Sequence, residues 1–224
     1  ILLDAYALIY RAHFAFIKNP RINSKGLNTS AIFGFCNSLL EVTNKFDPSH
    51  IGVVFDPPGG SDREGVFADY KANRQEMPED IRKAIPYIFD LLKAMNIKVE
   101  MEEGFEADDV IGTLAKQAEK KGFETYMMTP DKDFGQLVSD HIFIYKPGRS
   151  GNPSEILGPK EVCEKFEVKD PLQVIDILGL WGDAVDNIPG VPGVGEKTAK
   201  KLISTYGSIE TVSYTHLRAH ETRS

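Results

Sequence analysis

The chain has 224 residues, of which 42% are apolar and 26% charged, and both values are ordinary for a globular protein. No apolar run approaches the ~20 residues that span a bilayer, so we expect no membrane segment, and the first residues lack the pattern of a secretory signal. Cys36 and Cys163 lie far apart and outside any C-x-x-C pattern, which argues against a disulfide framework or a zinc knuckle and predicts a reducing, cytoplasmic setting.

The net charge of −7 argues against a nucleic-acid partner, because phosphate binding usually requires a basic surface. That objection weakens if the acids are concentrated in one site, since local charge then matters more than the total. Nine clustered carboxylates, described below, account for more than this excess of negative charge.

Short apolar runs rich in β-branched residues predict strands at 1–3, 50–55, 97–101, 124–129 and 142–145. Apolar residues at helical spacing predict helices around 32–40, 81–95 and 110–121. Pro78, followed by Glu79 and Asp80, marks the start of the second of these helices. Strands that alternate with helices predict an α/β fold with a mainly parallel sheet flanked by helices.

The composition changes after residue 145, where prolines and glycines at 147–153 interrupt the pattern and short helices follow. We therefore predict a first domain over 1–154 and a smaller helical region over 155–212. The stretch 213–224 lacks apolar periodicity and resembles translated adaptor sequence, so we treat it as a non-native tail. The chain also opens on Ile1, inside a predicted strand, which predicts that residues are missing upstream.

Acidic residues follow three of the predicted strands and gather in two further segments. In parallel sheets, ligands bind outside the carboxyl ends of the strands. A single aspartate there is usually a turn residue or a helix cap, and each acidic cluster alone could be a solvated loop. Together they form nine acids in five segments: Asp4, Asp56, Glu106, Asp108, Asp109, Asp131, Asp133, Asp183 and Asp186.

Clustered carboxylates repel one another unless cations lie between them, and hard oxygen ligands favour Mg²⁺ or Mn²⁺ over zinc. Two such ions roughly 4 Å apart can activate a water molecule and stabilise the leaving oxygen in phosphodiester hydrolysis. The five histidines show no ligand spacing, and no G-x-S-x-G motif supports Ser-His-Asp chemistry.

A glycine-rich hairpin with Gly190, Gly193 and Gly195 precedes a segment that carries Lys197, Lys200 and Lys201. Glycines allow backbone amides to approach phosphate oxygens, and the start of a helix favours an anion. The motif differs from a nucleotide-binding loop because Glu196 separates Gly195 from Lys197 and no strand precedes it. An ordinary turn between helices stays an alternative.

The segment 60–74 follows Asp56 and is rich in glycine and charge. Tyr70, Lys71 and Arg74 in it could stack a base and hold phosphates. A solvated surface insertion explains the same composition equally well.

Taken as a set and in this order, these motifs resemble the 5′-nuclease domain of bacterial DNA polymerase I. The resemblance runs from residue 1 to about 212. It rests on Leu3-Asp4, on Val-Phe-Asp at 54–56, on Tyr-Lys-Ala-Asn-Arg at 70–74, on Gly-Phe-Glu-Ala-Asp-Asp at 104–109, on Thr-Pro-Asp-Lys-Asp at 129–133, and on the acids and glycines of 182–199. Ala184-Val185 departs from the small hydroxyl residues common in the family, but all the expected acids remain.

The resemblance implies a PIN-like 5′-nuclease core over 1–154 with an arch at 57–80, and a helix-hairpin-helix element within 155–212. It implies a two-metal hydrolase that acts on DNA with a free 5′ end, such as a flap or a nicked duplex, in primer removal and repair. Asp4, Asp56, Glu106, Asp108 and Asp109 would serve chiefly the first metal, and Asp131, Asp133, Asp183 and Asp186 the second.

By the same resemblance, Tyr70, Lys71 and Arg74 lie in the arch, and Lys71 faces the scissile phosphate. Gly190, Gly193, Gly195, Lys197 and Lys200 hold the duplex backbone, with K⁺ as a candidate monovalent cation. Lys71, Arg74, Asp131 and Asp183 are thus the residues expected to matter most for catalysis.

Two other functions stay open: a standalone PIN-class ribonuclease, and a non-catalytic DNA-binding module that needs only the hairpin. We expect a monomer. Fusion to a polymerase domain after residue 212 is not decided by the sequence.

Overall fold

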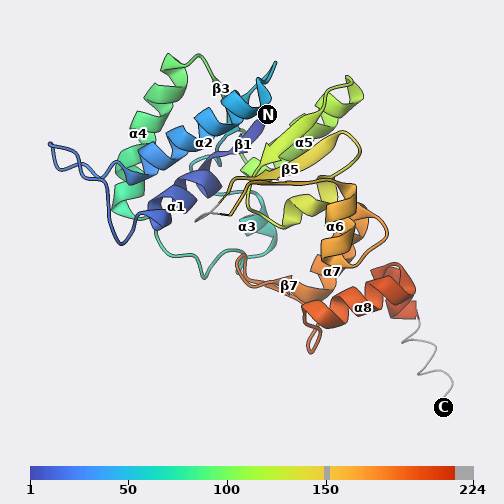
Figure 1. The fold of residues 1–224 in the computed structure, drawn as a ribbon. Helices are drawn as coiled ribbons and strands as arrows, with labels where there is room; N and C mark the ends of the chain where they lie inside the picture. The colour runs from blue at the N-terminus through green and yellow to red at the C-terminus, as the bar shows by residue number, and fades with distance from the viewer. Residues whose placement is uncertain (149–151, 215–224) are drawn as a thin grey trace, which may run out of the picture. The chain divides into compact units, whose positions relative to one another are not determined.

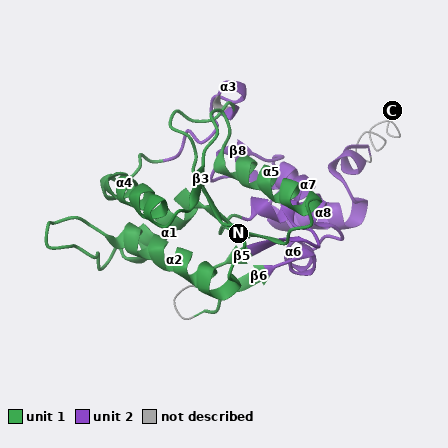
Figure 2. Cartoon of the chain, turned by 90° about the horizontal axis from the view of Figure 1, so that it is seen from above, with its two compact units in different colours: residues 1–62, 75–131, 145–156 green, residues 63–74, 132–144, 157–224 purple. Residues whose placement is uncertain are grey.

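The computed structural model describes residues 1–148 and 152–214. The chain forms two compact units, coloured separately in Figure 2. Unit 1 comprises residues 1–62, 75–131 and 145–156, and unit 2 comprises 63–74, 132–144 and the chain from 157 on. The tail predicted over 213–224 lies, from residue 215, outside the described residues. The predicted domain boundary at residue 154 stays a prediction.

A six-stranded sheet has the order β3-β2-β1-β4-β5-β6. β1 pairs in parallel with both β2 and β4, and β2 pairs in parallel with β3. The five predicted strands are confirmed, and β6 was not predicted. The strands are β1 (Leu2–Asp4), β2 (Gly52–Val54), β3 (Lys98–Glu100), β4 (Thr125–Met128), β5 (Ile142–Lys146) and β6 (Glu155–Leu157).

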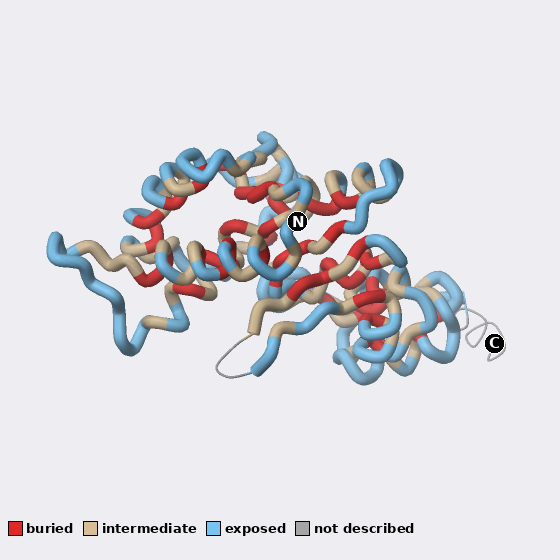
Figure 3. The backbone as a smooth tube through the Cα atoms, turned by 45° about the horizontal axis from the view of Figure 1, so that its top comes forward, coloured by how far each residue is buried: buried red, intermediate tan, exposed pale blue. Residues whose placement is uncertain are grey.

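Four helices of unit 1 flank this sheet and supply much of its core (Figure 1). They are α1 (Ala5–Ala15), α2 (Ser30–Phe46), α4 (Glu79–Ala94) and α5 (Ala107–Lys120). Phe35 and Leu39 of α2, with Ile88 and Leu92 of α4, are fully buried. Burial therefore alternates with exposure along these helices, as Figure 3 shows and as their apolar spacing predicts. Leu40 is one of the apolar residues in the helix predicted around 32–40, but it lies outside the buried face of α2, because its side chain is 43% exposed.

The starts of the helices place acids near the carboxyl ends of the strands. Asp4 caps α1, where its Oδ1 accepts a hydrogen bond from the Ala7 backbone N–H at 3.1 Å. α4 starts directly after Pro78, as predicted. α5 starts at Ala107, three residues before the predicted Val110, so Asp108 and Asp109 occupy its first turn. Acids are favourable there because they face the positive end of the helix dipole.

Unit 2 is mainly helical, as the sequence predicts, but it contains a small antiparallel ribbon that the sequence did not indicate. The ribbon pairs β7 (Gly182–Asp183) with β8 (Ile188–Pro189). The other elements are α3 (Arg63–Val66), the short 3-10 helices η1 (Asp133–Leu137) and η2 (Pro171–Gln173), α6 (Pro159–Phe166), α7 (Val174–Trp181) and α8 (Glu196–Tyr206). Within the described residues, no helix has the length and apolar character required to cross a membrane.

Candidate active site

Three aspartates lie just beyond neighbouring parallel strands of unit 1. Asp4 ends β1, Asp56 follows β2 by two residues, and Asp131 follows β4 by three. β1 lies between β2 and β4, so these carboxylates reach the same edge of the sheet, as the sequence predicts. We call them, together with the acids at the start of α5, the first acid group: Asp4, Asp56, Glu106, Asp108, Asp109 and Asp131.

Asp4 is held on both carboxylate oxygens. Oδ1 accepts from the Ala7 backbone N–H, and Oδ2 accepts from the Thr129 hydroxyl at 3.0 Å. Burial raises the pKa of Asp4 to about 6, and the nearby charges of Asp56 and Asp131 add to the rise against the lowering effect of those two hydrogen bonds. The negative charges of this group are therefore close enough to penalise one another.

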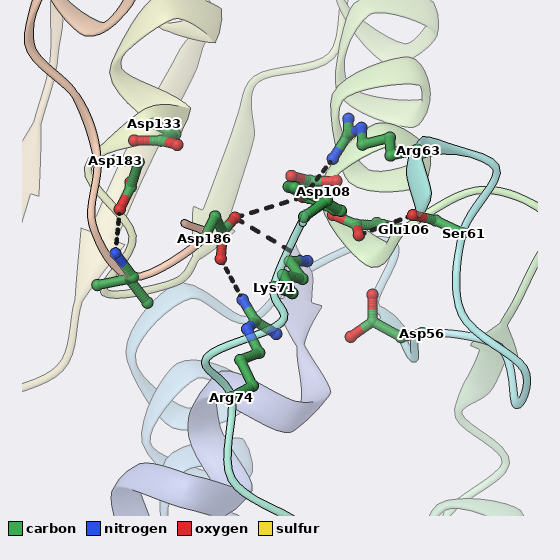
Figure 4. Close-up of polar contacts among 12 residues, drawn as sticks. Asp56, Ser61, Arg63, Lys71, Arg74, Glu106, Asp108, Asp133, Asp183 and Asp186 are labelled. Carbon is green, nitrogen blue, oxygen red and sulfur yellow. Dashed lines mark hydrogen bonds and ion pairs between the residues drawn. The ribbon is translucent and has the colours of Figure 1, made fainter. Parts of the chain in front are cut away.

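The start of α5 is held by carboxylates from two segments. Asp56 Oδ1 accepts from the Ala107 backbone N–H at 2.8 Å, which satisfies one of the unpaired donors of the first turn. Asp109 Oδ2 accepts from the Glu106 backbone N–H at 3.2 Å. Glu106 is buried and accepts a hydrogen bond from the Ser61 hydroxyl at 3.0 Å, as Figure 4 shows.

Unit 2 holds a second acid group, formed by Asp133, Asp183 and Asp186. The ammonium of Lys132 contacts Asp183 Oδ2 and lies 3.3 Å from Asp133 Oδ1. Burial alone would raise the pKa of Asp183, but the hydrogen bonds from Lys132 and from the Val185 backbone N–H outweigh it and lower that pKa. Lys132 therefore neutralises part of this group.

Asp186 contacts the three arch residues that are predicted to bind DNA. Arg74 Nη2 lies 2.6 Å from Asp186 Oδ1, the Tyr70 hydroxyl donates to Oδ2 at 3.3 Å, and Lys71 Nζ lies 4.0 Å from Oδ2. Figure 4 shows the side chains of Lys71 and Arg74 pointing toward Asp186. The Lys71 backbone N–H also donates to the Asp186 carbonyl at 2.9 Å. The structure thus brings arch residues and a predicted metal ligand together.

Two asparagines connect the same segments. The Asn73 side chain donates to the Ala184 carbonyl at 2.8 Å, and the Asn187 side chain donates to the Asp69 carbonyl at 2.7 Å. Segment 69–74 therefore both donates hydrogen bonds to, and accepts them from, the loop that carries Asp183 and Asp186.

Across residues 1–148 and 152–214, no three His, Cys, Asp or Glu side chains form a group arranged to hold a metal ion. Asp4, Asp56, Glu106, Asp183 and Asp186 instead accept hydrogen bonds or form ion pairs with protein donors. The chemistry of the donors nevertheless suits a hard divalent cation, because every predicted ligand is a carboxylate.

The hairpin leads into α8, as predicted, but its glycines have different local roles. A Cβ on Gly190 would lie 2.2 Å from the Trp181 carbonyl oxygen, so this glycine allows close backbone packing. Gly193 has a φ of +80°, which favours glycine. Gly195 has a φ of −90°, and a Cβ there would meet no heavy atom within 4 Å.

The lysines of α8 also differ. Lys197 is exposed at the start of the helix. Lys200 lies against the end of α6: its ammonium donates to the Lys165 carbonyl at 2.9 Å and pairs with Glu196 at 2.9 Å. The contact with Lys165 gives Lys200 a part in holding α8 to α6, in addition to its predicted role in DNA binding.

Sequence reasoning assigned no role to Thr129, Ser61 or Lys132, although each contacts a predicted metal ligand. Thr129 and Lys132 lie inside the motif at 129–133, so their proximity in sequence to Asp131 and Asp133 could have indicated a role for them. Ser61 lies in segment 60–74, which the sequence also singled out, but the sequence pattern assigned it no contact with Glu106.

The geometry agrees with the comparisons with known proteins. Residues 1–167 match the family model described as 5′-3′ exonuclease, N-terminal resolvase-like domain. Residues 169–223 match the model described as 5′-3′ exonuclease, C-terminal SAM fold. The chain belongs to the 5′-3′ exonuclease family. The predicted 5′-nuclease domain, of the kind found at the N-terminus of bacterial DNA polymerase I, is confirmed.

Two curated relatives illustrate this membership. The chain is 43% identical to DNA polymerase I of Bacillus subtilis over 211 residues, which cover 94% of the chain and 24% of the polymerase. It is 40% identical to a 5′-3′ exonuclease of Aquifex aeolicus over 211 residues, which cover 94% of the chain and 71% of that exonuclease. The chain therefore spans about a quarter of the polymerase relative.

Solved structures share the fold. T5 5′-exonuclease with zinc ions bound has a TM-score of 0.77 at 20% identity, over 94% of this chain and 76% of that one. A bacteriophage T5 flap endonuclease in a pseudo-enzyme–product complex with DNA and metal ions has a TM-score of 0.76 at 19% identity, with the same coverage. The predicted α/β fold with a mainly parallel sheet and a C-terminal helical region is confirmed.

Proposed function

We propose that this 5′-3′ exonuclease domain hydrolyses DNA phosphodiester bonds near a free 5′ end, both stepwise and at flaps, with divalent cations held by its acid groups. The observation that carries the proposal is the convergence of Asp4, Asp56 and Asp131 beyond three neighbouring parallel strands. A cation between them would offset the mutual repulsion that contributes to the raised pKa of Asp4.

Two Mg²⁺ or Mn²⁺ ions are the cofactors that this donor set favours. Asp4, Asp56, Glu106, Asp108 and Asp109 would hold chiefly the first, and Asp131, Asp133, Asp183 and Asp186 the second. When bound, such ions supply a hydroxide nucleophile and stabilise the leaving oxygen.

The arch residues bind the substrate in this proposal. Arg74 captures a terminal phosphate, Tyr70 stacks against a base, and Lys71 places its ammonium by the scissile phosphate, where it stabilises the charge that develops in the transition state. Because Lys71 and Arg74 contact Asp186, they must exchange a carboxylate for a phosphate when DNA binds.

The hairpin holds the duplex away from the reacting bond. Gly190, Gly193 and Gly195 bring backbone amides to a strand, Lys197 and Lys200 add positive charge, and K⁺ is the monovalent ion we expect there. We propose further that the domain acts as a monomer in the cytoplasm and takes part in primer removal and repair. The two forms open to it are fusion to a polymerase after residue 212 and a standalone exonuclease.

The test is cleavage of a 5′-flap DNA, labelled at its 5′ end, across an Mg²⁺ and Mn²⁺ titration. Asp183→Asn removes a charge at nearly constant volume, so it should preserve the fold and abolish most turnover. Asp90→Asn is the matched control, because Asp90 is an exposed aspartate of α4 that lies outside the arch and outside the acid groups. Cleavage that persists in chelator would exclude the metal-dependent mechanism.

Two further arms separate the alternatives. Preference for single-stranded RNA over the DNA flap would indicate a PIN-class ribonuclease. Flap binding without any metal-dependent cleavage would indicate a DNA-binding module.

A further inference from the structure

Thr129 is a fully buried polar residue that joins two segments of the first acid group. Its hydroxyl donates to Asp4 Oδ2 at 3.0 Å and accepts from the Asp131 backbone N–H at 3.2 Å. The sheet fixes this geometry: Leu3 pairs with Met128 across β1 and β4, so Asp4 and Thr129 lie side by side at the next position.

The two hydrogen bonds of the Thr129 hydroxyl restrain different groups, one a side chain and the other a backbone turn. The first orients the Asp4 carboxylate, whose other oxygen already accepts from the Ala7 backbone N–H. The second fixes the backbone of the turn that carries Asp131. Because Pro130 has no backbone N–H, the N–H of Asp131 is the first donor after β4 that can anchor this turn to the Thr129 hydroxyl.

One hydroxyl therefore sets the positions of two acids that lie far apart in the sequence. A carboxylate oxygen has two lone-pair sites, so the oxygen that accepts from Thr129 keeps a site for another ligand. The contact can thus persist while Asp4 binds a cation, as supporting hydrogen bonds do in metal sites generally.

We propose that Thr129 is a positioning residue that sets the direction of the Asp4 carboxylate and the place of Asp131 for divalent-cation binding. The proposal rests on the function proposed above, in which both acids are metal ligands. A purely structural role, in which the hydroxyl only satisfies its own hydrogen bonds, predicts a loss of stability without a specific change in metal binding.

Thr129→Val removes the hydroxyl at nearly constant shape, whereas Thr129→Ser keeps it. The control is Thr125→Val, because Thr125 is a buried threonine at the start of β4, the strand that Thr129 directly follows, and lies outside the acid groups. Mn²⁺ binding is measured by titration calorimetry without DNA, the metal dependence of flap cleavage is measured under single-turnover conditions, and the melting temperature of each variant is followed in parallel.

We expect Thr129→Val to weaken Mn²⁺ binding and to raise the half-saturating metal concentration by about 10- to 100-fold, the range seen when outer hydrogen bonds of metal ligands are lost. Thr129→Ser should stay within a few-fold of the parent, and Thr125→Val should change only the melting temperature. Parental Mn²⁺ affinity in Thr129→Val would overturn the proposal, and so would an equal loss in Thr125→Val.

The two proposals fail in different ways. A parent chain that binds Mn²⁺ but does not cleave DNA contradicts the proposed function, while the calorimetric comparison still decides the role of Thr129. A parent chain that binds no Mn²⁺ overturns both.

Discussion

Replacing Arg74 with glutamine should tighten metal binding, because Arg74 and a cation compete for the same carboxylate. Arg74 Nη2 lies 2.6 Å from Asp186 Oδ1, and Asp186 is a proposed ligand of the second metal. Glutamine keeps a polar side chain of similar reach but carries no charge, so the variant leaves Asp186 open to a cation.

The size of the expected change in metal affinity depends on how far the Arg74–Asp186 ion pair is exposed to solvent. The Arg74 side chain is 51% exposed, so solvent screens its ion pair with Asp186. The pair therefore contributes a net stabilisation of about 1 kcal/mol, less than a buried pair would. Lys71 stays near Asp186 in the variant and limits the gain further. About 1 kcal/mol corresponds to roughly a fivefold lower dissociation constant for the metal.

The assay is titration calorimetry with Mn²⁺ in the absence of DNA. Arg82→Gln is the matched control, because Arg82 is an exposed arginine whose side chain donates to the Met77 carbonyl at 3.5 Å. In an Asp186→Asn background, the Arg74 substitution should have no further effect on affinity. Unchanged or weaker Mn²⁺ binding in Arg74→Gln than in Arg82→Gln would refute competition at Asp186.

Four further outcomes are expected. Because the pKa of Asp4 is raised to about 6 and a cation binds the ionised form, metal affinity should fall by on the order of tenfold per pH unit below about pH 6; a flat profile from pH 7 to 5, measured by calorimetry, would contradict this. In the metal-free protein, the raised pKa means that folded Asp4 keeps its proton up to a higher pH than unfolded Asp4. The contribution of Asp4 to the free energy of unfolding should therefore decrease as the pH rises from 3.8 to about 6. Asp4→Asn should remove this pH dependence in thermal melts. Lys71→Ala should slow single-turnover cleavage at saturating enzyme by roughly 10²-fold, and parental rates would rule out its place at the scissile phosphate. Gly195→Val should keep the fold, because the site is open and φ is −90°, but should lower DNA affinity and the salt slope by about 0.9; a parental slope would leave the hairpin as a structural turn.

The strand-end aspartates were predictable because they depend on local patterns. Short apolar runs mark the strands, and parallel strands deliver their carboxyl ends to one edge, so Asp4, Asp56 and Asp131 could be grouped without coordinates. The start of α5 was less certain, because polar residues such as Asp108 and Asp109 carry no apolar periodicity. The helix was therefore predicted to start three residues late.

The contacts among these residues were not predictable, because they depend on pairing across long sequence separations. The hydroxyl of Thr129 meets Asp4 only through the register of β1 with β4, across 125 positions. Lys132 meets Asp183 only through the folding of unit 2. The ribbon of β7 and β8 is also too short for its alternation to show, with two residues in each strand.

The lysines of α8 have different surroundings, which the sequence pattern could not distinguish. The sequence places three lysines on α8, and nothing in their spacing separates them. The structure binds Lys200 to Lys165 and Glu196, while Lys197 is exposed. Removal of Lys200 should therefore affect the packing of α8 on α6 as well as any contact with DNA.

The two acid groups differ in what a cation must replace. In the first group, Asp4, Asp56 and Glu106 accept hydrogen bonds from neutral backbone and hydroxyl donors. A cation can share such oxygens, since each keeps a lone-pair site. In the second group, Asp183 and Asp186 bind ammonium and guanidinium groups, whose positive charge opposes an incoming cation. Metal binding should therefore occur first in the first group. The second group should fill once the cations of the arch have moved to DNA, which makes the second metal depend on substrate.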